Sequence, residues 1–162
     1  MKIKYLLAVV ISSALLMAGC SSTPPERPAY TGADSVNDIN EQMIIGQWTT
    51  RSLNPIEGEP TDLGVSTYNP DGSVVAKFRD EQSGLDLEYE MLGRWSIQGD
   101  AVTVQVDSID ETSGNSLGPL VKVFMNAFKK KMGGSFNVYD SSADQLVIVA
   151  TTGQAQEWNR IQ

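Results

Sequence analysis

The chain has 162 residues, of which 41% are hydrophobic, so it is long enough to form one domain with a buried core. It contains no histidine, which excludes Ser-His-Asp and Cys-His catalytic systems and argues against zinc and copper sites. The formal net charge of −8 argues against nucleic acid as a partner, because nucleic-acid binding needs a basic surface.

Residues 1–19 have the features of a targeting signal. Lys2 and Lys4 precede an apolar stretch, and small residues directly precede Cys20, the only cysteine. The stretch is short for a membrane span of about 20 residues and no basic cluster follows it, which disfavours a single anchoring helix. The four residues ending at Cys20, Met-Ala-Gly-Cys, resemble the lipobox of bacterial lipoproteins. This resemblance implies cleavage before Cys20 and acylation of that cysteine, and Ser21 after it implies sorting to the outer membrane.

Residues 20–42 are predicted to be a lipid-anchored flexible tether. They are rich in Ser, Pro, Asp and Asn and offer only Tyr30, Val36 and Ile39 as sizeable apolar side chains. A coil of this length holds a domain roughly 25–30 Å from the lipid. The end of the segment, near residues 34–43, is also compatible with a short helix.

From residue 44 onward, apolar residues mostly alternate with polar ones, as in antiparallel strands with one face toward a core. Turn sequences such as Asn-Pro-Asp-Gly at 69–72 separate these stretches. The pattern predicts about eight strands, at 44–52, 62–69, 73–80, 85–97, 101–107, 135–140, 145–151 and 155–161. We therefore expect residues 43–162 to form a mainly β domain, a single antiparallel up-and-down β-barrel without exposed edges.

Residues 116–134 instead have helical spacing and predict one amphipathic helix inserted between the fifth and sixth strands. In one interpretation this helix covers the open end or one side of the barrel and buries Phe124 and Phe128. In the other it docks on anionic lipid or on a partner, because the segment from 112 to 139 contains no acid. The candidate membrane or partner face consists of Lys122, Phe124, Phe128, Lys129, Lys130 and Lys131.

The acidic residues do not predict a catalytic or metal site. Asp86, Glu88 and Glu90 alternate along one strand and are expected to form its solvated outer face. Asp107, Asp110 and Glu111 are expected in a loop before the helix, with a spacing that does not match an EF-hand. We therefore predict no enzymatic activity and no cofactor.

Gly46 and Trp48 on the first predicted strand, together with Arg160 on the last, resemble the lipocalin-like barrels of the calycin group. The resemblance implies that Trp48 closes one end of the barrel while Arg160 packs across its ring. A guanidinium over an indole is worth about 0.5–2 kcal/mol. Lipocalins usually carry their long helix after the last strand, whereas here the predicted helix lies between the fifth and sixth.

Together these features predict a non-catalytic lipoprotein of the outer membrane that faces the periplasm and binds a small apolar ligand or lipid. An eight-stranded barrel can enclose one small ligand. The alternative is a protein-interaction module with a filled barrel core, such as an envelope assembly accessory or a protease inhibitor. The Gly-Gln-Trp sequence at 46–48 also resembles part of the opening strand of periplasmic protease inhibitors built on a small barrel.

Replacement of the predicted acylation site tests the anchor. A Cys20→Ala chain should remain uncleaved or reach the wrong compartment, because it lacks the thiol that accepts the lipid. Membrane fractionation and the mass of the purified protein measure this outcome. Normal lipidated processing of the variant would contradict the prediction.

Overall fold

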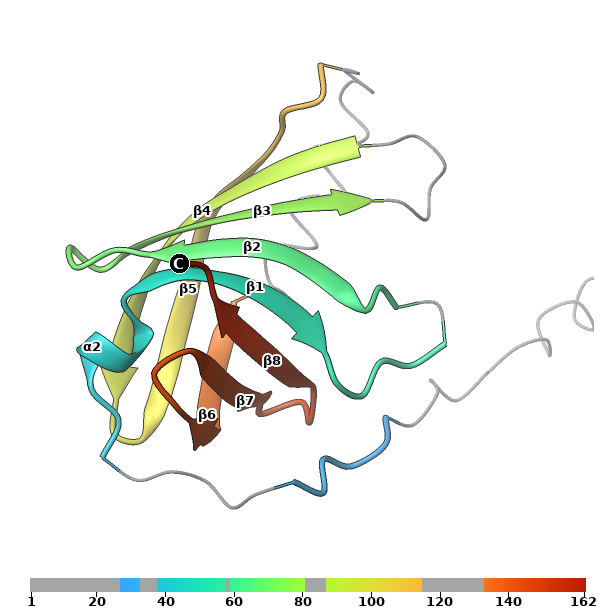
Figure 1. Ribbon diagram of the computed structural model, residues 1–162. Coiled ribbons are helices and arrows are strands. Elements are labelled where there is room, and N and C mark those ends of the chain that lie inside the picture. Colours follow the sequence, from blue (N-terminus) through green and yellow to red (C-terminus); the bar gives the residue numbers. More distant parts are fainter. Residues whose placement is uncertain (1–26, 33–37, 58, 81–86, 115–132) are drawn as a thin grey trace, which may run out of the picture.

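The computed structural model describes residues 27–32, 38–57, 59–80, 87–114 and 133–162, which contain a closed barrel (Figure 1). Its strands are β1 (Gly46–Ser52), β2 (Asp62–Tyr68), β3 (Ser73–Asp80), β4 (Leu87–Gln98), β5 (Ala101–Glu111), β6 (Gly134–Ser141), β7 (Gln145–Ala150) and β8 (Ala155–Arg160). Each strand pairs antiparallel with the next, and β8 pairs with β1. The prediction of a mainly β, up-and-down barrel of eight strands is confirmed.

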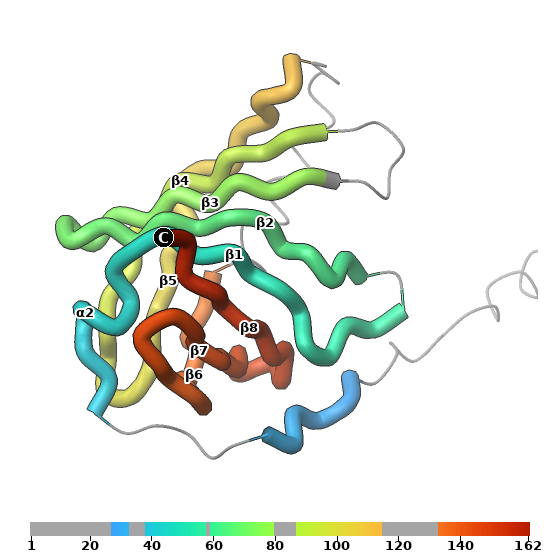
Figure 2. The backbone as a smooth tube through the Cα atoms, viewed as in Figure 1, coloured from blue at the N-terminus to red at the C-terminus, as the bar shows by residue number. Residues whose placement is uncertain are grey.

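A short helix, α2 (Glu41–Ile44), precedes β1 and distinguishes the two ends of the barrel. We call the end where α2 lies, and where β1 begins, the α2 end. The opposite end, where β1, β3, β5 and β7 finish, is the distal end (Figure 2). The predicted turn at 69–72 lies at the α2 end, where the Gly72 amide donates to the Asn69 carbonyl at 3.1 Å.

The core gathers around the α2 end of the barrel interior. Along β1, the inward residues Trp48, Thr50 and Ser52 are buried and alternate with exposed ones, as the period-two pattern predicts. The contiguous core cluster consists of Ile39, Ile44, Trp48, Tyr68, Val74, Trp95, Val102, Val104, Val138, Leu146, Ile148 and Trp158. Burial of each large apolar side chain is worth about 1.5–3 kcal/mol, so this cluster supplies much of the stability of the domain.

The fifth strand is longer than predicted, and this corrects the expected acidic loop. Asp107, Asp110 and Glu111 lie on β5, which runs to residue 111 instead of ending at 107. A bulge is the reason: Val106 pairs with Gly93 and Ser108 with Leu92, so Asp107 is an extra residue. The extra residue interrupts the alternation of apolar and polar positions from which strand ends are predicted.

The predicted helix over 116–134 cannot be compared in the same way, because residues 115–132 lie outside the described residues. This also applies to its candidate membrane or partner face, at positions 122, 124 and 128–131. Gly134, which was expected to end the helix, is the first residue of β6, with a φ of 155°. Among the described residues, no helix is long and apolar enough to cross a membrane.

Residues 27–32, which we call the strap, make contacts with the outside of the barrel. Arg27 Nη1 donates to the Asn54 carbonyl at 2.7 Å, and Arg27 Nη2 pairs with Glu59 Oε1 at 2.6 Å. Asn54 Nδ2 donates to the Pro28 carbonyl at 2.8 Å. This part of the predicted tether is therefore attached to the domain through charge-assisted and neutral hydrogen bonds.

Asn54 also joins the strap to the β7–β8 turn at the distal end. Its Nδ2 also donates to the Gly153 carbonyl at 2.9 Å, and its Oδ1 accepts from the Ala155 amide at 2.8 Å. Farther along the strap, the ring of Tyr30 meets that of Tyr139 edge-on, with centroids 5.4 Å apart. The strap thus continues from the distal end onto the outer face of β6.

The ion pair of the strap makes its attachment pH-dependent. The Arg27 guanidinium lowers the pKa of the Glu59 carboxyl below its ordinary value of 4.5, although partial burial opposes this shift. A lowered pKa stabilises the attached strap fully above pH 4.5, and this contribution is lost as the pH falls through the lowered pKa. In a carboxyl NMR titration, Glu59 should therefore titrate at lower pH in the native protein than in Arg27→Ala. Equal midpoints would contradict the pairing.

Candidate functional site

At the α2 end, Arg160 of β8 lies over Trp48 of β1, with its Cζ 4.1 Å from the ring centroid. Its guanidinium also donates three hydrogen bonds: Nε to the Ala143 carbonyl at 2.7 Å, Nη1 to Ile45 at 2.7 Å and Nη2 to Met43 at 3.1 Å. The planar fork of an arginine suits several acceptors at once. Arg160 therefore joins β1, β8, α2 and the β6–β7 turn.

Gly46 leaves room for this arrangement. Its φ of +139° lies in a region that L side chains rarely adopt, and a Cβ atom here would sit 2.3 Å from Arg160 Nη1. The Trp48 indole is fully buried and donates from Nε1 to the Ile44 carbonyl at 2.8 Å. The structure thus brings Gly46, Trp48 and Arg160 together at one end of the barrel.

Aromatic rings fill the half of the interior nearest α2. Tyr68 stacks on Trp158 with centroids 4.9 Å apart and meets Trp95 edge-on at 5.8 Å. Trp48 contacts Trp158 at 6.1 Å. Burial raises the pKa of the Tyr68 phenol, so this hydroxyl stays neutral at physiological pH. This half of the barrel is packed core.

The inner face of the distal half is lined by apolar residues outside the core cluster. Ala76, Leu87, Tyr89 and Met91 are buried there but do not belong to the contiguous core cluster, and Phe78 stacks on Tyr89 at 5.3 Å. These residues make the inner faces of β3 and β4 apolar.

Buried hydroxyl groups lie on the inner face of β1. Thr50 and Ser52 are only 7% and 5% exposed, and neither Thr50 Oγ1 nor Ser52 Oγ has a hydrogen-bond partner. An unsatisfied buried hydroxyl costs about 1–3 kcal/mol. The distal half therefore combines an apolar wall with unused hydrogen-bonding capacity.

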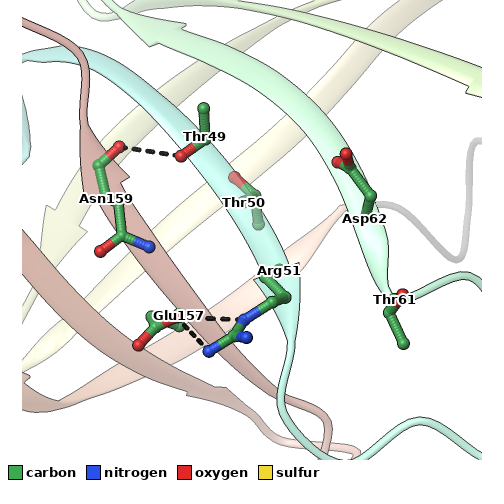
Figure 3. A pocket seen from close by; sticks show the side chains of 7 residues that line it. All are labelled: Thr49, Thr50, Arg51, Thr61, Asp62, Glu157 and Asn159. Atoms are coloured by element: carbon green, nitrogen blue, oxygen red, sulfur yellow. Dashed lines mark hydrogen bonds and ion pairs between the residues drawn. The ribbon is translucent and has the colours of Figure 1, made fainter.

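A depression of about 460 Å³ lies on the outside of the barrel where β1 meets β8 and the start of β2 (Figure 3). Arg51 donates to Glu157 Oε2 from Nε and Nη2, at 3.1 and 2.7 Å, and Gln145 donates to Glu157 Oε1. These groups already bond to one another, which leaves little unmet hydrogen-bonding capacity for a ligand. The residues that line the depression are Thr49, Thr50, Arg51, Thr61, Asp62, Glu157 and Asn159.

The acidic residues singled out in the sequence mostly form cross-strand ion pairs on the outer surface. Glu88 pairs with Arg79, Glu90 with Lys77 at 3.5 Å, and Asp107 with Arg94 at 3.2 Å. Asp86 and the predicted acylation site Cys20 lie outside the described residues. The described part of the chain holds no group of three or more His, Cys, Asp or Glu residues placed to bind a metal.

Sequence reasoning overlooked the inward hydroxyls of β1 and the role of Asn54. The inward position of the hydroxyls could have been predicted. Thr50 and Ser52 lie two and four residues after Trp48, and residues two apart on a strand point to the same face. Asn54 had no comparable signal, because its partners lie in distant parts of the chain.

No family model matches this chain, and no curated protein matches it. Among solved structures, it is similar to an uncharacterized protein from Bacteroides eggerthii, with 14% identity and a TM-score of 0.48 over 72% of this chain and 98% of that one. It is also similar to a lipocalin-like protein from Bacteroides uniformis, with 13% identity and a TM-score of 0.45 over 74% and 99% of the two chains. Similarities this distant do not bear on what the chain binds.

Removal of the Arg160 side chain should destabilise the barrel. An Arg160→Ala variant loses three charge-assisted hydrogen bonds and the contact with Trp48, so we expect a loss of about 3 kcal/mol in the free energy of unfolding. Arg94→Ala removes an ion-paired but 65% exposed arginine and should change stability by only about 0.5 kcal/mol. Urea unfolding measures both variants, and equal effects would contradict the assigned role of Arg160.

Proposed function

We propose that the chain is an outer-membrane lipoprotein, facing the periplasm, whose barrel binds a small apolar or amphiphilic molecule in its distal half. The contrast between the two halves of the interior carries this proposal. Rings fill the α2 half, whereas the distal half offers an apolar wall on β3 and β4 and buried hydroxyls on β1. Such a combination of mostly apolar surface and a few polar groups is typical of small-molecule sites.

The ligand class follows from these inner faces. Tyr89 and Met91 offer contacts to a hydrocarbon body, and Thr50 and Ser52 offer hydrogen bonds to an uncharged polar group. A charged group on the ligand would be disfavoured, because no side chain of opposite charge is described at these inward positions. A fatty alcohol, a monoacylglycerol or a protonated fatty acid fits this chemistry.

Anchoring through Cys20 is a second part of the proposal and rests on the sequence signal at 17–20. Three acyl chains on one residue give far firmer membrane attachment than a single chain. A protein so anchored works beside a source of apolar ligands, which suits the proposed binding.

The alternative function, protein interaction, is favoured by the ring packing of the α2 half. A barrel whose interior is filled throughout would act through its outer surface. Crosslinking in cells separates the two functions, because a stoichiometric protein partner favours interaction, whereas a bound lipid recovered with the protein favours ligand binding.

A matched pair of substitutions on β4 tests the ligand site. Met91→Gln places an amide on the inner face, whereas Leu92→Gln makes a similar change at a neighbour that is 41% exposed on the outer face. Burial of the new amide costs about 1–3 kcal/mol, so the first variant should bind a hydrophobic dye about tenfold more weakly, and the second should bind it normally.

Dye titration and native mass spectrometry, at a temperature where both variants remain folded by circular dichroism, measure this difference. Equal binding by the two variants would contradict a site in the distal half. A protein that carries no ligand after gentle purification and takes up neither dye nor fatty acid would contradict ligand binding altogether.

A further inference from the structure

The strap determines which part of the barrel lies close to the lipid anchor. Arg27 is bonded to Asn54 and Glu59 in the connection between β1 and β2. Asn54 in turn is bonded to Gly153 and Ala155 at the β7–β8 turn. Both connections lie at the distal end, so Arg27, the first described residue after Cys20, is held there.

The distance from the anchor to this attachment is short. Seven residues separate Cys20 from Arg27, and seven extended residues span at most about 25 Å. Without the strap, the next described attachment would be Ile39 in the core, 19 residues from Cys20, and the reach would be about 65 Å. Strand β4 alone, with 12 residues, is about 40 Å long, so the anchor holds one end of the barrel nearer the membrane than the other.

The charges of the turns at the α2 end agree with this orientation. Each described turn at the α2 end carries an exposed aspartate: Asp71, Asp100 and Asp144. Acidic groups avoid a bilayer surface with negatively charged headgroups.

Beside the strap, the distal end has a turn without charged residues. Its β7–β8 turn, Thr-Thr-Gly-Gln at 151–154, carries no charge, and Leu53 beside the strap is 37% exposed. This uncharged turn and the exposed leucine are compatible with contact with lipid headgroups, and the charged residues of the neighbouring β1–β2 connection include Glu57, which is exposed, and Glu59, which is paired with Arg27.

We propose that the distal end of the barrel is its membrane-facing surface and that the strap, held by Arg27, sets this orientation against the bilayer. The inference rests on the proposed acylation of Cys20. It adds that the half of the barrel with the apolar inner wall faces the lipid, from which an apolar ligand would reach it by the shortest path.

Single-cysteine labels at the two ends test the orientation. Because Cys20 is acylated in the mature protein, a fluorophore can be attached at Thr152→Cys in the distal turn or at Asp100→Cys in the turn at the α2 end. Each full-length acylated protein is placed in phospholipid vesicles that contain a lipid with a nitroxide on its headgroup. The label at position 152 should lose most of its fluorescence, and the label at position 100 should lose little.

A matched pair of arginine variants tests the role of the strap. Arg27→Ala should reduce the difference in quenching between the two labels, because the reach of the anchor increases. Arg51→Ala removes another arginine that is ion-paired on the outside of the barrel but does not touch the strap, and it should leave the difference unchanged. An equal effect of the two variants would overturn the role of Arg27.

Vesicle flotation separates failure of the anchor from failure of the orientation. A protein that floats with the vesicles but shows equal quenching at both ends, or stronger quenching at position 100, would overturn the orientation and leave the anchor intact. A protein that does not float would overturn the anchor and this inference with it.

Discussion

A cation held against the face of a buried indole joins the first and last strands of this barrel. The contact between Arg160 and Trp48 adds to the backbone hydrogen bonds and the Arg51–Glu157 ion pair that join β1 to β8, and a break between these strands would expose two sheet edges. The same guanidinium occupies carbonyl groups of Met43 and Ile45 at the end of α2, which a four-residue helix cannot satisfy by itself. One side chain therefore closes the sheet and holds the helix against its end.

The two halves of the barrel interior differ in how their side chains are packed. Near α2, the stacked rings of Tyr68, Trp95 and Trp158 leave the core little freedom to change shape. Toward the distal end, the inner faces carry other residues, with buried hydroxyl groups on β1 and apolar side chains on β3 and β4. The packed core is thus concentrated near α2, and the inner surface proposed as a ligand site lies at the end where Arg27 is attached.

Much of the fold could be predicted from the alternation of apolar and polar residues, because in a sheet with one buried face every second side chain points toward the core. Glycine, proline and aspartate at the turns supplied most strand limits. The prediction was wrong where the period is locally interrupted, as at Asp107, whose insertion into β5 hides the continuation of the strand. It also missed contacts between distant segments, such as that of Arg27 with Asn54, because a lone arginine in a polar stretch has no pattern that reveals its partner.

The contacts of Asn54 have a consequence for the order of folding. Its side chain accepts a hydrogen bond from Ala155, which lies 101 residues later and begins the last strand. Contacts so distant along the chain form late and slowly, because the entropy of closing a long loop must be overcome first. The complete surface on which the strap rests is thus assembled only when β8 joins the sheet, and a fully seated strap marks a chain that has finished folding.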